Sequence, residues 1–170
     1  EEGELIMLYK THLSTSLNVA IPALYLSNEL SLLTLTGVGL GSLLPDLDTP
    51  NSFIGRRLKI ISYPLSTIFK HRGFLHSITP VILIFILGIF LKSLFIKSIA
   101  LGYLLHLVGD TFSESGIKWF LPFYNKDIKM PLGILRYRTG GLKEYVILGI
   151  SIVILMLEIQ KFHLINLFSI

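Results

Sequence analysis

Histidines and aspartates recur in short motifs along this chain of 170 residues, which contains five histidines and no cysteine. His106 and Asp110 are four residues apart, so they lie on one face of a helix. That spacing suits two ligands of one metal ion, or one ligand and the residue that orients it. It suits equally a hydrogen bond between packed helices. Because no thiolate is available, any metal site must be built from histidine, aspartate and glutamate.

A second motif, residues 71–77 (HRGFLHS), places two histidines five residues apart at the start of an apolar segment. His71 and His76 can converge on one ion there, and the planar guanidinium of Arg72 suits a phosphate or a carboxylate. Ser77 could cap the helix that follows. A simpler interpretation makes His71 and Arg72 residues that extend from a membrane interface into water. We favour ligands, because His76 lies at the apolar edge and needs a polar partner.

Four further acidic or histidine residues carry weaker signals when each is taken alone. Asp46 and Asp48 alternate in residues 44–48 (LPDLD), which indicates only a solvated turn after a helix. His12 would be an ordinary capping or core histidine. Glu144 suits the first turn of a helix, where a carboxylate is favourable, and it could instead be a general base or another ligand.

The chain as a whole is apolar, with 52% hydrophobic and 15% charged residues and a mean hydropathy of +0.69. Soluble domains average about 25% charged residues, so we predict an integral membrane protein that forms a single domain over residues 1–170. The apolar content excludes a disordered chain, and the absence of cysteine excludes a disulfide scaffold. The net charge of +4 is attributed to a membrane surface rather than to nucleic acid.

The apolar segments predict an all-α bundle of about five helices, at residues 11–27, 30–44, 77–97, 98–111 and 143–158. Two long polar connections, residues 45–76 and 112–142, join them, and such loops are usually functional and contain short helices or ordered turns. Most segments are shorter than the roughly 20 apolar residues of a clean membrane span, so an all-helical soluble protein is the alternative. The acidic start of the chain lacks the basic region of a signal peptide, and none is expected.

Threading five helices through a bilayer places both long connections on one side, together with 12 of the 15 lysines and arginines. The positive-inside rule makes that side cytoplasmic. The same arrangement gathers four of the five histidines and three of the four aspartates at this membrane face. Ionisable groups near the depth of the bilayer are functional by default. The joint pattern therefore favours a functional site over the separate structural interpretations.

Several of these motifs, in this order, resemble the YdjM-like family of bacterial and archaeal inner-membrane proteins. They are Thr11-His12, residues 41–48 (GSLLPDLD), residues 71–77 (HRGFLHS), residues 102–110 (GYLLHLVGD) and Glu144. The resemblance covers roughly residues 11–144. It implies a metal-dependent hydrolase, linked in one branch of the family to LexA regulation, and a distant similarity to zinc-dependent phospholipases C implies phosphoesters. The family often has threonine where this chain has Leu75, which we expect to alter packing rather than ligation.

The residues and the resemblance together predict a membrane-bound hydrolase that uses metal-activated water on a phosphoester of a lipid or lipid-like substrate. One or two divalent ions are expected, Zn²⁺ first and Mn²⁺ or Mg²⁺ as alternatives, because the candidate ligands exceed what one tetrahedral site uses. These ligands are His12, Asp46, Asp48, His71, His76, His106 and Asp110. The catalytic candidates are Glu144, Arg72 and Asp48, and the candidates for phosphate binding are Arg56, Arg57 and Arg72. Membrane lipid is the expected partner, and nucleic acid is not.

Two functions of other classes remain as alternatives. A transporter or channel would place its polar groups near the middle of the bilayer, often in inverted repeats, and the sequence shows no repeat. A non-catalytic membrane module would use a closed metal site only to hold its loops together. The chain contains neither the Gly-x-Ser-x-Gly motif of serine hydrolases nor a P-loop.

Overall fold

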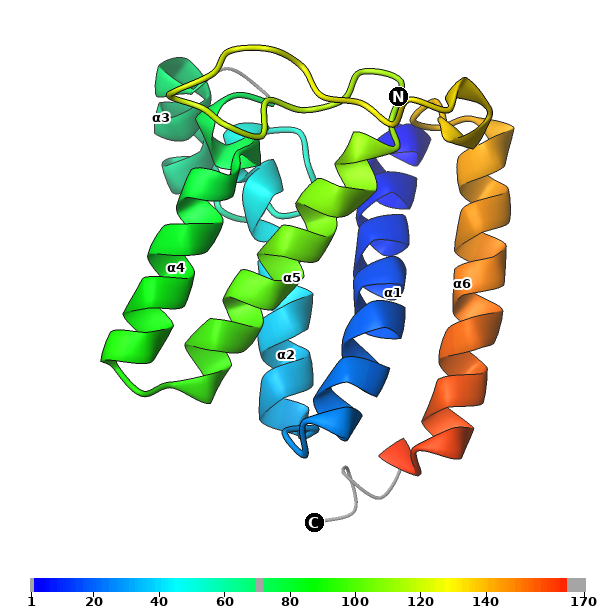
Figure 1. Ribbon diagram of the computed structural model, residues 1–170. Coiled ribbons are helices and arrows are strands. Elements are labelled where there is room, and N and C mark those ends of the chain that lie inside the picture. Colours follow the sequence, from blue (N-terminus) through cyan, green and yellow to red (C-terminus); the bar gives the residue numbers. More distant parts are fainter. Residues whose placement is uncertain (1, 70–71, 165–170) are drawn as a thin grey trace.

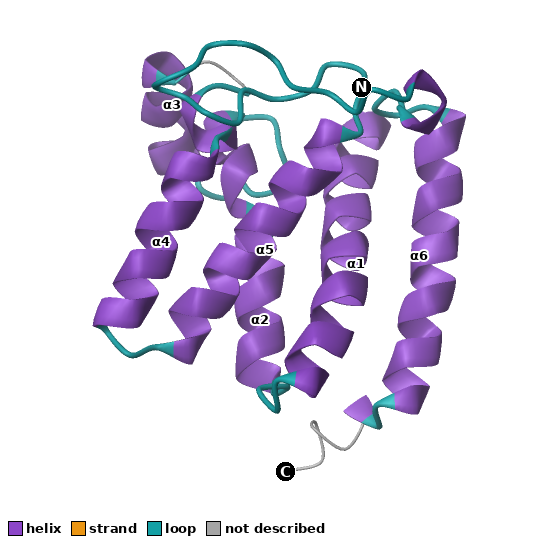
Figure 2. Cartoon of the chain, viewed as in Figure 1, coloured by secondary structure: helices purple, strands orange, loops and turns teal. Residues whose placement is uncertain are grey.

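The apolar segments of the chain form helices that lie side by side (Figure 1, Figure 2). The computed structural model describes residues 2–69 and 72–164. The α-helices are α1 (Glu2–Leu26), α2 (Leu32–Gly41), α3 (Lys59–Ile68), α4 (Ile78–Phe90), α5 (Leu94–Thr111) and α6 (Leu142–Lys161). Three short 3-10 helices are η1 (Leu44–Asp48), η2 (Phe74–His76) and η3 (Gly133–Leu135). Within the described ranges no strand forms, and the all-α class is confirmed.

The structure has six α-helices where about five were expected, and the additional one, α3, lies within the first long connection, where short helices or ordered turns were expected. The third and fourth helices were expected to meet between residues 97 and 98, but the turn between α4 and α5 lies at Lys92 and Ser93. Lys92 takes a left-handed φ of 50°, and the Ser93 hydroxyl accepts the first-turn N–H of Ile96 at 3.3 Å. Lys97 was expected to end the third helix, but it lies inside α5. The helix begins instead after Ser93, because the serine side chain caps its first turn.

The outer helices also differ from the expected limits. α1 begins at Glu2 rather than near residue 11, and α6 continues to Lys161 rather than ending near residue 158. Of the expected apolar tail, residues 165–170 lie outside the described part of the chain.

Both long connections, together with α3, lie at the same end of the bundle (Figure 1). The start of α1, the end of α5 and the start of α6 are at this end, which we call the loop end. Among the described helices α5 is long and apolar enough to cross a membrane, and α4 is apolar but shorter, with 13 residues. Because these helix ends meet at the loop end, residues that are distant in the sequence lie close together there.

The second long connection is tied firmly to the loop end. Ile78 donates its N–H to the carbonyl of Trp119 at 2.8 Å, and the Thr79 hydroxyl donates to the carbonyl of Leu121 at 2.6 Å. Ile117 is fully buried against Tyr103 and other side chains of α4 and α5. The connection thus forms an ordered cover over the helix ends.

Glycines allow α2 and α5 to pack backbone against backbone. A Cβ atom at Gly41 would overlap the carbonyl of Ile99, and one at Gly102 would overlap the carbonyl of Val38. Small residues at such contacts let two helices approach closely in membrane proteins. The close approach brings the C-terminal end of α2 against α5, where His106 lies.

We predict that Gly102→Ala lowers the free energy of unfolding by about 1–3 kcal/mol, because the methyl group overpacks this contact. Gly149 of α6 has open space around it and provides the matched control. Gly149→Ala should leave the stability unchanged or raise it by up to about 1 kcal/mol, since alanine favours a helix more than glycine does. Thermal unfolding in detergent measures both variants. Equal effects at the two positions would contradict a tight α2–α5 contact.

Candidate metal centre

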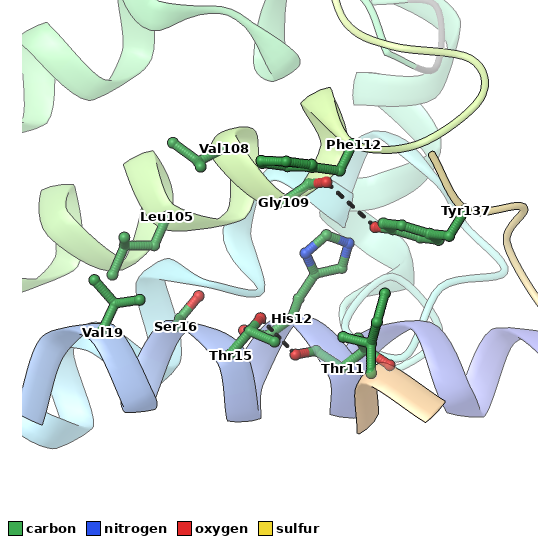
Figure 3. A pocket seen from close by; sticks show the side chains of 11 residues that line it. Thr11, His12, Thr15, Ser16, Val19, Leu105, Val108, Gly109, Phe112 and Tyr137 are labelled. Carbon is green, nitrogen blue, oxygen red and sulfur yellow. Dashed lines mark hydrogen bonds between the residues drawn. The ribbon is translucent and has the colours of Figure 1, made fainter. Parts of the chain in front are cut away.

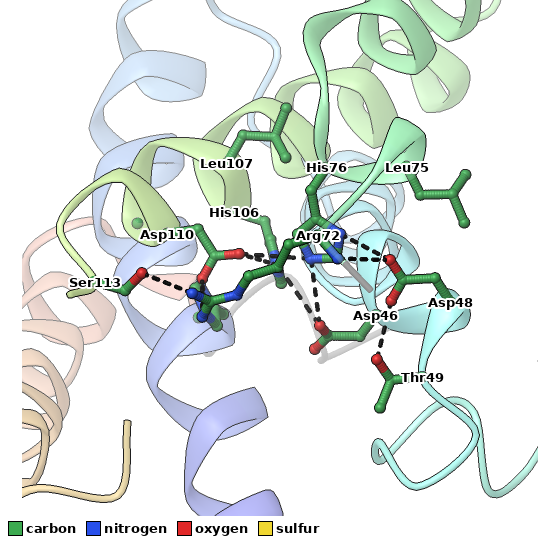
Figure 4. Close-up of polar contacts among 12 residues, drawn as sticks. Asp46, Asp48, Thr49, Arg72, Leu75, His76, His106, Leu107, Asp110 and Ser113 are labelled. Carbon is green, nitrogen blue, oxygen red and sulfur yellow. Dashed lines mark hydrogen bonds and ion pairs between the residues drawn. The ribbon is translucent and has the colours of Figure 1, made fainter. Parts of the chain in front are cut away.

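Five of the candidate ligands meet at the loop end (Figure 4). They come from α1, η1, η2 and α5, and each is 5% exposed or less. Two overlapping groups have ligand atoms that all lie within 4.8 Å of one another: His12, His106 and Asp110 form one group, and Asp46, His76 and His106 form the other. We call these five residues the ligand cluster. Imidazole nitrogens and carboxylate oxygens together suit zinc or a similar divalent ion.

The orientation of His106 is set by a backbone carbonyl. Its Nδ1 lies 2.7 Å from the carbonyl oxygen of Ser42. A carbonyl only accepts, so Nδ1 carries the hydrogen, and in the neutral ring Nε2 keeps its lone pair. Nε2 has no hydrogen-bond partner among the described residues, and it lies 3.8 Å from Asp46 Oδ1 and 3.5 Å from Asp110 Oδ2. A buried lone pair that faces two carboxylates can be satisfied by a proton or by a metal ion bound between these groups.

His76 is oriented by a carboxylate. Its Nδ1 lies 3.1 Å from Asp48 Oδ2, while its Nε2 lies 3.7 Å from Asp46 Oδ1 and 3.5 Å from Asp110 Oδ2. A carboxylate on one ring nitrogen and the metal on the other is the usual arrangement of a metal-binding histidine. The geometry therefore supports Asp48 as the group that orients His76, with Asp46 and Asp110 on the metal side.

Asp110 is central to the cluster, because its two oxygens face different partners. Oδ2 faces both His76 and His106, whereas Oδ1 lies 3.4 Å from His12 Nε2 and 3.7 Å from a terminal nitrogen of Arg72. The His12 and His106 rings are stacked, with centroids 4.0 Å apart. Asp110 would thus be shared between the two groups of candidate ligands if a metal ion were bound.

The protonation of the cluster residues outside the long helices follows from these contacts. Burial raises the pKa of the Asp46 carboxyl, but the nearby His106 and His76 lower it more, so the pKa lies below its ordinary value. Burial lowers the pKa of His76, but the nearby carboxylates of Asp46 and Asp48 raise it above its ordinary value. Asp46 is thus ionised, as a ligand must be, and a metal ion would displace a proton from His76.

Arg72 lies at the edge of the cluster, and its side chain is 18% exposed. It has a φ of 59°, a left-handed conformation that is uncommon for a residue other than glycine. Its backbone N–H donates to Asp48 Oδ2 at 3.2 Å, and its guanidinium donates to the Ser113 hydroxyl at 3.1 Å. These two hydrogen bonds hold the strained backbone in place, and the guanidinium then lies beside Asp110.

Glu144 is fully buried at the start of α6. One carboxylate oxygen accepts the N–H of Gly140 at 2.7 Å, which fits the structural interpretation of a carboxylate in a first helical turn. The other oxygen has no hydrogen-bond partner among the described residues. Burial and the charges of Asp110 and Glu144 raise the pKa of Tyr137, which places the Glu144 charge within electrostatic reach of that ring.

Arg56 and Arg57 are not brought into the cluster. Arg57 lies with its guanidinium 3.7 Å above the Phe53 ring and donates to the Phe53 carbonyl at 2.9 Å. Arg56 makes no hydrogen bond or ion pair with the ligand cluster in the described ranges. His71 lies outside the described residues. The roles expected for these three residues stay predictions.

A cavity of about 240 Å³ adjoins the cluster at His12, between α1, α5 and the start of α6 (Figure 3). His12 and Tyr137 line its loop end, and the Tyr137 hydroxyl donates to the carbonyl of Gly109 at 3.3 Å. Val19 and Leu105 are among its apolar walls. Tyr137 and Ser42 were not expected from the sequence, because an aromatic residue in a loop and a backbone carbonyl carry no motif.

The family of the chain is shown by comparison with known proteins. Residues 7–168 match the family described as YdjM inner membrane protein. The chain belongs to the YdjM family. This confirms the resemblance seen in the motifs and supports the predicted membrane localisation.

Individual relatives agree with the family match. The chain is 40% identical over 87 residues to Inner membrane protein YdjM of Escherichia coli K12 and of Shigella flexneri, covering 47% of this chain and 44% of each relative. The alignment thus spans less than half of those proteins. The chain is also 30% identical over 146 residues to Uncharacterized protein YvsG of Bacillus subtilis, and this alignment covers 82% of the chain and 86% of that relative. No solved structure matches.

We predict that elemental analysis of the purified protein finds about one to two divalent ions per chain, and that His76→Ala and His106→Ala each lose them. The matched control is His163→Ala, because His163 is exposed beyond the end of α6. It should retain the metal. Retention of metal in both cluster variants would contradict the proposed ligand set.

Asp48→Asn should weaken metal binding by about 10–100-fold without abolishing it, because an orienting carboxylate is removed and the ligands remain. Competition with a chelator of known affinity measures the change. Asp127→Asn, at an exposed position of the second long connection, is the control and should have no effect. Complete loss of metal in Asp48→Asn would instead make Asp48 a ligand.

Proposed function

We propose that this protein is a membrane-embedded, metal-dependent hydrolase that acts on a phosphoester of a lipid or lipid-like substrate. The observation that carries the proposal is the buried lone pair of His106 Nε2, aimed at two carboxylates beside a cavity. A bound divalent ion would lower the pKa of a coordinated water towards about 7 and polarise the phosphoryl oxygen. We expect Zn²⁺, with one or two ions held by the ligand cluster and Mn²⁺ or Mg²⁺ as alternatives.

The proposed membrane arrangement places the loop end at the cytoplasmic face. The membrane family, the apolar α4 and α5, and the basic residues concentrated in the long connections support a multi-pass bundle in this orientation. The ligand cluster would then lie at the level of the lipid headgroups. A phosphoester of a membrane lipid reaches that depth without leaving the bilayer.

Two residues of the chain would act on the substrate directly. Arg72 presents a partly exposed guanidinium beside Asp110, and its planar fork would bind phosphate oxygens. Glu144 has a buried carboxylate oxygen without a hydrogen-bond partner in the described part of the chain, and this oxygen would accept or return a proton. Asp48, which was expected among the catalytic residues, would act by orienting His76.

A second candidate function follows from the burial of the site. His76 and His106 are both 0% exposed, and a fully enclosed ion is typical of a structural metal that holds loops together. A transporter is less consistent with the structure, because the cluster lies at one end of the bundle.

Activity measured with and without a chelator distinguishes the enzyme from the structural module. We predict that the purified protein hydrolyses phosphatidic acid or phosphate diesters, and that chelation abolishes the activity reversibly. Glu144→Gln should lower kcat by about 10²–10⁴-fold while retaining metal, because the amide keeps an acceptor for Gly140 but loses the proton-accepting charge. Glu158→Gln, in the last turns of the same helix, is the control. Full activity in Glu144→Gln would contradict the proton-transfer role.

A further inference from the structure

Two neighbouring cavities form a continuous groove between α1 and α6. The cavity beside His12 and a second one, of about 270 Å³, share three lining residues: Thr15, Val19 and Ile147. The second cavity continues along both helices to Ile154. We call the two together the α1–α6 groove.

The groove has polar and apolar side chains at its loop end and mostly apolar ones beyond it, where Asn18 and Ser151 bond to each other. Its loop end contains His12, a member of the ligand cluster, and its far end is lined by Ile150 and Ile154. Asn18 is bonded to Ser151, so the lining stretches of α1 and α6 overlap in depth. At 1.5 Å per residue, the rise from His12 to Asn18 is roughly 9 Å, and the rise from Ser151 to Ile154 adds roughly 5 Å. Val19 is 55% exposed and Ile150 is 58% exposed, so the groove opens on the side of the bundle.

A polar side chain lies inside this groove without a partner. Ser16 is 1% exposed, one turn along α1 from His12, and its hydroxyl has no hydrogen-bond partner among the described residues. Figure 3 shows the hydroxyl directed toward α5, on the same side of α1 as His12. A buried hydroxyl without a partner is costly, so an occupant with an oxygen acceptor at this depth would satisfy it.

The width of the groove is fixed at its far end. Asn18 donates through its side-chain amide to the hydroxyl of Ser151 at 2.8 Å and to the Ser151 carbonyl at 2.9 Å. These bonds hold α1 and α6 together beside the second cavity. Two other apolar hollows, one between α4 and α5 and one lined by α1, α2 and Leu164, contain no residue of the ligand cluster.

We infer that the α1–α6 groove binds one hydrocarbon chain of a phospholipid, with the phosphate at His12 and Arg72 and a linking ester oxygen at Ser16. This inference rests on the proposed function for the identity of the phosphate site. The lipid enters from the side of the bundle between α1 and α6, and its phosphate reaches the ligand cluster while its chain stays at membrane depth. The apolar walls, the unpartnered hydroxyl and the cationic Arg72 occur in the order in which a phospholipid presents its chain, ester and phosphate.

The test uses the full chain in detergent with a phosphatidic acid that carries a photoreactive group in its acyl chain. Crosslinks, mapped by mass spectrometry, should concentrate on residues 15–19 and 147–154. Val19→Trp fills the groove and should lower this crosslinking at least fivefold. Val153→Trp, at a 57% exposed position of α6 that does not line the groove, is the matched control and should have no effect. Thermal unfolding of both variants verifies that each is folded.

The role of Ser16 is tested by titrating the same probe. Ser16→Ala should raise the half-saturating lipid concentration about three- to tenfold, the effect of one hydrogen bond. Ser14→Ala should not, because the Ser14 hydroxyl donates within α1 to the Thr11 carbonyl. Crosslinks spread evenly over the exposed faces of α4 and α6, unchanged by Val19→Trp, would overturn the inference.

A metal-free variant separates this inference from the proposed function. His76→Ala should keep the crosslinks in the groove while losing metal, because His76 does not line either cavity. Groove crosslinks in the metal-loaded parent protein, together with no hydrolase activity, would support the lipid site and contradict the enzyme. Activity on soluble phosphoesters without groove crosslinks would support the enzyme and overturn the lipid site.

Discussion

Three aspartate carboxylates are buried at one end of an apolar bundle, and the structure around them depends on neutralising their charge. Asp46, Asp48 and Asp110 are each 5% exposed or less. An unpaired buried carboxylate costs several kcal/mol, so such groups are paired or coordinate a metal. Here the partners are histidines and Arg72, and the arrangement leaves His106 Nε2 facing two carboxylates. The same geometry that makes the charges tolerable makes the cluster suitable for a divalent cation.

The helices serve this cluster through a small number of backbone features. The glycine contact between α2 and α5 brings the Ser42 carbonyl within 2.7 Å of His106 and fixes which ring nitrogen is available. The left-handed conformation of Arg72 lets one residue hold Asp48 through its backbone and approach Asp110 through its side chain. Both the glycine contact and the left-handed backbone of Arg72 position polar groups through close packing rather than through additional charged groups. Membrane surroundings and a metal site are thus compatible, because the polar groups satisfy one another at the loop end.

Much of this arrangement could be predicted from residue spacing, and the rest could not. The four-residue spacing of His106 and Asp110 predicts a shared helical face, and both lie in the cluster. Asp46 and Asp48 alone indicated a solvated turn, but tertiary packing buries them in η1. The sequence could not predict that Asp46 would be a ligand and Asp48 an orienting residue, because this assignment depends on the distances from His76 to each carboxylate. A short helix or ordered turn was expected within the first long connection, but the limits of α3 could not be predicted, because its apolar spacing is brief and Pro64 lies inside it.

We propose that imidazoles and carboxylates from separate segments bind one shared ion or ion pair. X-ray absorption spectroscopy at the edge of the bound metal tests it most directly, because the first shell and the imidazole rings give distinct signals. For zinc we expect nitrogen and oxygen ligands at about 2.0–2.1 Å. The three histidines of the ligand cluster would supply about three imidazole rings to a single ion, or about one and a half per ion on average if two ions are bound. A shell of oxygen atoms alone, as expected for an ion held loosely at the surface, would contradict it.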